Sequence, residues 1–131
     1  MHTDLYIARK TLQALRDVII LRPGQDAECL ERLHRLVAQA DALIEDAQCK
    51  ELLQTVLRYG NDLYSPTGPA KWERPRMSGA SYLRLQMLAK LLVFDNRIAE
   101  LETARDIELQ AGLADLSNSA KPDQFSSGTR H

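Results

Sequence analysis

The sequence predicts an all-α fold: a four-helix, bundle-like domain with one long C-terminal helix and a proline-rich loop before it. First, the apolar residues are mostly Leu, Ala and Ile, and aromatic residues make up only 5% of the chain, a composition that favours helices over strands. Second, apolar residues recur at steps of three and four along most of the chain, as they do on one face of a helix. Third, three of the five prolines lie in one stretch, 65–79, which separates the last helical segment from the others.

Length, charge and cysteine content narrow the class of protein. A chain of 131 residues is typical of one domain, and its formal charge of −1 gives no overall field that would attract nucleic acid or an anionic membrane. No apolar run approaches the roughly 20 residues of a membrane span, and the first residues lack the apolar core of a secretory signal. Two cysteines are too few for a disulfide scaffold. We therefore expect a cytoplasmic protein that does not enter a membrane.

The first helix is expected over 4–21, and the next helical segment over 27–59. Pro23 and Gly24 end the first helix, and Asp26 is a suitable N-cap for the next. The apolar face of the first helix is formed by Leu5, Ala8, Leu12, Leu15 and Ile19. In the second segment one stripe is followed by another in a different phase, formed by Leu30, Leu33, Val37, Ala40 and Ile44 and then by Cys49, Leu53 and Val56. This change of phase predicts a break near 45–48, although one continuous helix remains the alternative, and Gly60 is expected to end the segment.

The fourth helix is expected over 80–110, after an irregular loop. Ser78 or Ser81 is a suitable N-cap, and Gly112 is the expected end. From Ser117 onward the composition turns polar, so we expect one helical domain over 1–116 and a disordered tail over 117–131.

The fourth helix carries two apolar stripes, so it should be covered from more than one side. The first consists of Met87, Leu91, Phe94, Ile98 and Leu101, and the second of Leu85, Leu88 and Leu92. At 1.5 Å per residue this helix is longer than the others, and its end should extend past them. A homodimer interface through Ile98, Leu101 and Ile107 would cover that extension. The alternative is a solvated helix with charged pairs such as Arg97 and Glu100.

Residue patterns that carry catalytic or metal chemistry are weak. Glu31 and His34 match one Glu-x-x-His element of a di-iron bundle, but the required second element is missing, and a partly exposed surface pair explains them better. Cys29 and Cys49 lack the closely spaced partners of a zinc site and are expected to be structural thiols that form no disulfide. We therefore expect no metal, no cofactor and no enzymatic activity.

The loop holds the only tryptophan of the chain among three cations. Aromatic rings beside arginine are typical of protein-binding hot spots, and also of platforms for single-stranded nucleic acid. In a third interpretation, Trp72 folds back as a lid on the end of the bundle, with its N–H bonded. Tyr59 also flanks the loop. The candidate partner-binding residues are Lys71, Trp72, Arg74, Arg76, Tyr64 and Tyr82.

These observations predict a non-catalytic protein-interaction module, such as an adaptor, chaperone, inhibitor or immunity-type partner. The first alternative is a small regulator that contacts nucleic acid through the basic loop, and the second is an enzyme with an unrecognised site. Another protein is the expected partner, with a possible homodimer, and nucleic acid is a weaker candidate because three cations are a small footprint for phosphates.

Overall fold

A computed structural model of the chain describes residues 2–21 and 27–120, with side chains over 4–20 and 27–114. These residues are almost entirely helical, as the sequence predicts, and the only β pairing among them is an isolated bridge between Arg74 and Met77. The elements are α1 (His2–Leu21), α2 (Ala27–Leu43), α3 (Ala47–Leu63), a short 3-10 helix η1 (Pro69–Trp72) and α4 (Gly79–Ala120).

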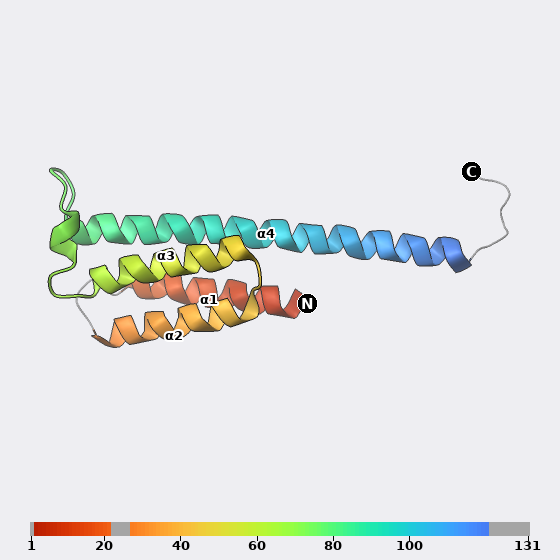
Figure 1. Cartoon of the computed structure of the whole chain (residues 1–131), viewed down its shortest axis with the longest axis horizontal. Coiled ribbons are helices and arrows are strands. Elements are labelled where there is room, and N and C mark those ends of the chain that lie inside the picture. Colours follow the sequence, from red (N-terminus) through yellow and green to blue (C-terminus); the bar gives the residue numbers. More distant parts are fainter. Residues whose placement is uncertain (1, 22–26, 121–131) are drawn as a thin grey trace. The chain divides into compact units, whose positions relative to one another are not determined.

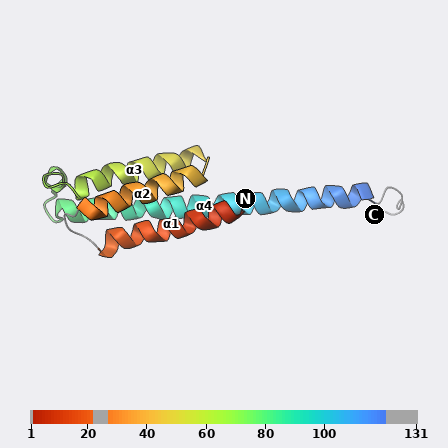
Figure 2. The same ribbon diagram turned by 90° about the horizontal axis from the view of Figure 1, so that it is seen from below.

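The chain divides into two compact units within α4, between Ile98 and Ala99. The first unit contains α1, α2, α3 and the N-terminal part of α4, and each helix runs antiparallel to the one before it (Figures 1 and 2). The short α2–α3 connection therefore lies at one end of this bundle, and the loop between α3 and α4 at the other (Figure 1). The second unit begins with the C-terminal part of α4, where Ile107, Leu109 and Leu113 are exposed.

The core of the first unit is built from the predicted apolar stripes. Leu30 is the exception on α2, because it is only half-buried. On α4 the core face runs from Leu83 to Ile98, and Leu101 is half-exposed. The fully buried large side chains are Leu5, Leu12, Leu15, Ile19, Leu33, Leu53, Leu63, Leu83, Met87, Leu91, Phe94 and Ile98.

The predicted break between α2 and α3 is present at residues 44–46. Asp46 is the N-cap of α3, and its Oδ2 accepts a hydrogen bond of 3.1 Å from the amide of Cys49. The same carboxylate accepts two bonds from Arg97 of α4, from Nε at 3.0 Å and from Nη2 at 2.7 Å. The bonds from Arg97 lower the pKa of Asp46 from 3.8 to about 2, and burial raises the pKa of the Cys49 thiol to about 12.

Several boundaries differ from the predictions. The helix predicted to end at Gly60 continues to Leu63, and α4 passes through Gly112 to Ala120. Residues 117–120, expected in a disordered tail, are therefore helical, whereas 121–131 lie outside the described residues. The start of α4 agrees with one of the two predicted caps: Ser78 caps the helix, because its Oγ accepts a bond of 3.1 Å from the Ser81 amide.

The second apolar stripe of α4 is not covered as expected. Leu85 and Leu92 are 52% and 56% exposed, while Leu88 is half-buried.

No helix among the described residues is long and apolar enough to cross a membrane. Cys29 and Cys49 are both buried, and no disulfide joins them.

Candidate functional site

The residues between α3 and α4, 64–78, form a loop that we call the Trp72 loop. Glycines allow this loop to lie against the bundle. A Cβ on Gly68 would lie 2.1 Å from the carbonyl oxygen of Asp62, and one on Gly79 would lie 1.6 Å from the carbonyl oxygen of Pro69. Neither position has room for a side chain, so these two glycines permit backbone contacts that fix where the loop leaves α3 and where it enters α4.

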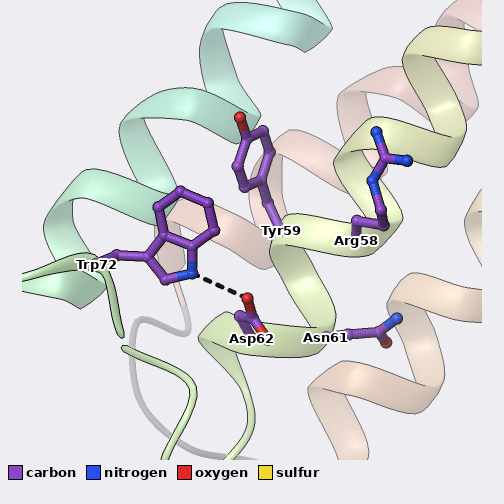
Figure 3. A pocket seen from close by; sticks show the side chains of 5 residues that line it. All are labelled: Arg58, Tyr59, Asn61, Asp62 and Trp72. Carbon is purple, nitrogen blue, oxygen red and sulfur yellow. Dashed lines mark hydrogen bonds between the residues drawn. The ribbon is translucent and has the colours of Figure 1, made fainter. Parts of the chain in front are cut away.

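Trp72 folds back onto the bundle, as the lid interpretation describes. It is half-buried, and its indole Nε1–H donates a hydrogen bond of 2.8 Å to Oδ2 of Asp62 on α3. The indole meets Tyr59 of α3 edge to face, with ring centroids 5.6 Å apart, and stacks on Tyr82 of α4 at 5.5 Å. Figure 3 shows the indole nitrogen pointing at Asp62, with Tyr59 beside the indole ring. One side chain therefore ties the loop to two helices through contacts that each contribute roughly 1 kcal/mol.

The residues after Trp72 form a tight turn. The amide of Arg74 donates to the carbonyl of Met77 at 3.0 Å, and the amide of Met77 donates back to the carbonyl of Arg74 at 3.2 Å. Pro75 and Arg76 are the two central residues, and Pro is favoured at the first of these because its φ is already fixed. Glu73 then accepts a bond of 2.8 Å from the amide of Gly79, so its carboxylate lies at the N-terminus of α4, where a negative charge is favourable.

The carboxylates in and beside the Trp72 loop have partners within the protein, whereas its cations are exposed. Both nearby carboxylates have internal partners, because Asp62 accepts from Trp72 and Glu73 accepts from Gly79. The guanidinium of Arg74 lies 4.3 Å from the ring centroid of Tyr82 and donates to the carbonyls of residues 72 and 73. Lys71 and Arg76 are exposed, and Nζ of Lys71 lies 4.0 Å from Oδ1 of Asp62, at the outer limit of an ion pair. The loop therefore presents positive charge to solvent.

A pocket that is partly open to solvent lies beside the indole. Figure 3 shows Arg58 pointing away from Asp62, with Asn61 on the far side of the carboxylate from Trp72. Asn61 is held by α2, because Nε2–H of His34 donates to its Oδ1 at 2.8 Å. The pocket is lined by Arg58, Tyr59, Asn61, Asp62 and Trp72.

The structure brings four of the six predicted partner-binding residues together, namely Lys71, Trp72, Arg74 and Tyr82. Arg76 lies on the same loop with its side chain exposed. Tyr64 does not belong to this surface, because it is only 4% exposed and its hydroxyl points to the carbonyl oxygen of Val18, 3.5 Å away, so we correct its assignment to the core.

Sequence reasoning noted that Tyr59 flanks the loop but missed Asp62, the hydrogen-bond partner of Trp72 on α3. Tyr59 and Asp62 are three residues apart and share one helix face. Ending the helix at Gly60 hid that relationship. The spacing of apolar residues in this segment continues to Leu63, and this was the available signal that the helix runs past Gly60. Leu63 is indeed buried, at 1% exposure.

The residues predicted for a dimer interface lie in different surroundings. Ile98 is fully buried in the first unit, so we assign it to the core. Leu101 is half-exposed and Ile107 is 61% exposed. Glu31 and His34 are both exposed on α2.

Within the part of the chain that the structure describes, no group of three His, Cys, Asp or Glu side chains is placed to hold a metal ion. Comparison of this chain with protein-family models, with curated proteins and with solved structures finds no match.

Proposed function

We propose that this protein is a non-catalytic protein-interaction module that binds its partner through the Trp72 loop. One observation carries the proposal. The loop is fixed to two helices by the indole of Trp72, yet its turn holds Arg76 exposed and Met77 38% exposed to solvent. A surface that is already ordered loses little conformational entropy on binding, which is the advantage of a pre-organised binding element.

This proposal changes the role first expected for Trp72. Because its N–H is bonded and its ring lies between α3 and α4, Trp72 acts as a latch that holds the loop and is not the main contact to the partner. The contacting residues are those that the latch presents: Lys71, Arg76 and Met77. Long loops in compact domains are usually functional, which supports a binding role for this one.

A pull-down from the source cell tests the function. The full chain, biotinylated at one terminus, is used beside two variants, Arg76→Glu in the turn and Arg35→Glu on the exposed surface of α2. We expect a protein that is retained by the wild type and by Arg35→Glu but lost with Arg76→Glu. Identical sets of captured proteins for all three baits would contradict the proposal.

Self-association is a separate proposal, because it uses a different surface. Its support is the exposed apolar side chains of α4 in the first unit, Leu85, Leu92 and Val93, which are more accessible than the predicted Ile98. Light scattering of the wild type and of Leu92→Glu tests it. We expect a larger species for the wild type only, and a monomeric wild type at high concentration would end the idea.

A further inference from the structure

We infer that the partner of the Trp72 loop presents an acidic segment, with a carboxylate that pairs with Arg76 and an adjacent apolar side chain that contacts Met77. This inference rests on the proposed function and specifies the chemistry of the partner. It uses three features of the loop: the surplus of positive charge, the occupied faces of the aromatic rings, and the exposed methionine.

The Trp72 loop carries more positive than negative charge. Residues 69–78 contain three cations, Lys71, Arg74 and Arg76, and one carboxylate, Glu73, which accepts a bond from the N-terminus of α4. The whole chain has a formal charge of −1, so this positive surface is local. Arg58, at the rim of the neighbouring pocket, adds a further exposed cation. A carboxylate-bearing partner is the complement of such a surface, because arginine binds carboxylates in a two-pronged geometry.

The aromatic rings decide between acidic protein and single-stranded nucleic acid, which is also negatively charged. Platforms for single strands offer exposed ring faces on which bases stack. Here the ring of Tyr82 already stacks with Trp72 and is contacted by the guanidinium of Arg74, and Trp72 also meets Tyr59. These rings are used inside the protein, and few cations remain to follow a phosphate backbone. The occupied rings therefore favour an acidic polypeptide.

Met77 indicates what lies next to the carboxylate. It is 38% exposed at the end of the turn, directly beside Arg76. Methionine is flexible and polarizable, and it is common at surfaces that receive apolar side chains of partners. Because Arg76 and Met77 are consecutive, one short peptide can contact both.

The experiment is a selection from a phage-displayed library of random 12-residue peptides on the immobilised full chain, with parallel selections on Arg76→Glu and on Arg35→Glu. The selected peptides are then synthesised and titrated by fluorescence anisotropy, and a fluorescein-labelled oligothymidine of about 20 nucleotides is titrated beside them. Circular dichroism checks that both variants keep their helix content.

We expect the wild type and Arg35→Glu to select peptides rich in Asp and Glu beside an apolar residue. Their affinity should fall at least 10-fold with Arg76→Glu, and it should fall as salt rises from about 50 to 500 mM, because exposed charge pairs are screened. Met77→Gln should weaken the same peptides while leaving their salt dependence unchanged.

Each other outcome overturns a defined part of the argument. Peptides that depend on Arg76 but lack acidic residues would refute the acidic partner and leave the interaction function standing. Wild type and Arg76→Glu selecting the same peptides, or neither selecting any, would refute the binding role of the loop itself. Oligothymidine that binds the wild type more tightly than any peptide, and is lost with Arg76→Glu, would refute both in favour of nucleic acid.

Discussion

The α2–α3 connection and the Trp72 loop lie at opposite ends of the four-helix bundle, and they contact α4 in different ways. At one end, Asp46 in the α2–α3 connection caps α3 and binds Arg97 through two hydrogen bonds, and the side chains are only 15% and 29% exposed. At the other end, the Trp72 loop is held by ring contacts and by one bond to Asp62, and its cations face solvent. The first end pairs the charge of Asp46 with Arg97 inside the protein, whereas the second leaves the positive charge of Arg76 exposed at the surface.

This difference separates a structural connection from a candidate binding surface. A short connection needs only to reverse the chain, and the ion pair of Asp46 with Arg97 secures that reversal. The Trp72 loop is longer than the reversal requires, and its latch holds exposed cations in place. If the two ends differ in this way, substitutions at each end should change the free energy of unfolding to different extents.

The largest effect is expected for Gly79→Ala, which should destabilise the protein by about 3 kcal/mol or displace the loop. The added Cβ would lie 1.6 Å from the carbonyl oxygen of Pro69, and a backbone atom cannot move aside easily. Gly112→Ala is the matched control in the same helix, because its added Cβ would meet nothing within 4 Å beyond its chain neighbours and the nearby backbone of its own helix. That control should stabilise the protein by about 0.5–1 kcal/mol, since alanine favours helix. Urea unfolding measures both, and equal effects of the two substitutions would contradict the close contact.

Next is Asp46→Ala at the opposite end, which should cost about 2–3 kcal/mol. The substitution removes the N-cap of α3 and leaves Arg97 without the carboxylate that it binds. Asp41→Ala breaks the pair between Asp41 and Lys50, whose side chains are about 40% exposed, and should cost at most about 1 kcal/mol. If thermal and urea unfolding show equal losses for the two substitutions, the ion pair does not secure this connection.

The pH dependence of stability should show the same ion pair. Because the folded-state pKa of Asp46 is lowered to about 2, its contribution is fully present above the unfolded-state value near 4 and is lost as pH falls towards 2. The contribution amounts to about 2 kcal/mol. Unfolding of the wild type and of Asp46→Asn should therefore differ at pH 6 and converge near pH 2. A difference that stays constant across this range would show that the charge of Asp46 is not involved.

A smaller effect is expected for Trp72→Phe, which keeps an aromatic ring but removes the N–H that bonds Asp62. The cost should be about 1 kcal/mol, the net value of one hydrogen bond to a partly buried carboxylate. Tyr6→Phe, at a side chain that is 59% exposed, serves as the control and should change the stability by less than about 0.5 kcal/mol. A neutral result for Trp72→Phe would show that the indole bond does not hold the loop.

Most of the fold, but not every helix boundary, could be predicted from the sequence. The helices and most of their core faces were predictable, because apolar periodicity reports directly which face is buried. The break at 44–46 was predictable because the stripe changes phase there. Glycine was a less reliable guide. A Cβ on Gly60 would lie 2.1 Å from Cδ2 of Leu33, so this glycine serves close packing of α3 on α2 and does not end the helix.

The candidate site was predictable only in part. The composition of the loop drew attention to Trp72, Arg74 and Arg76, and Tyr82, which was grouped with them, contacts Trp72 and Arg74. Asp62, the hydrogen-bond partner of the indole, could not be identified while the helix was thought to end before it. Whether a loop aromatic turns inward depends on tertiary packing, and Tyr64 shows this, because it turned into the core.

The most direct test of the central claim is a measurement of backbone order along the Trp72 loop by 15N relaxation in solution. If the latch holds the loop as an ordered binding element, order parameters over 69–78 should lie near 0.85, the value of a rigid backbone, and match those of α3. The same residues in Gly79→Ala should show lower values. Order parameters below about 0.6 over 73–78 in the wild type would mean that the loop is a flexible connection, which contradicts both the latch and the pre-organised surface.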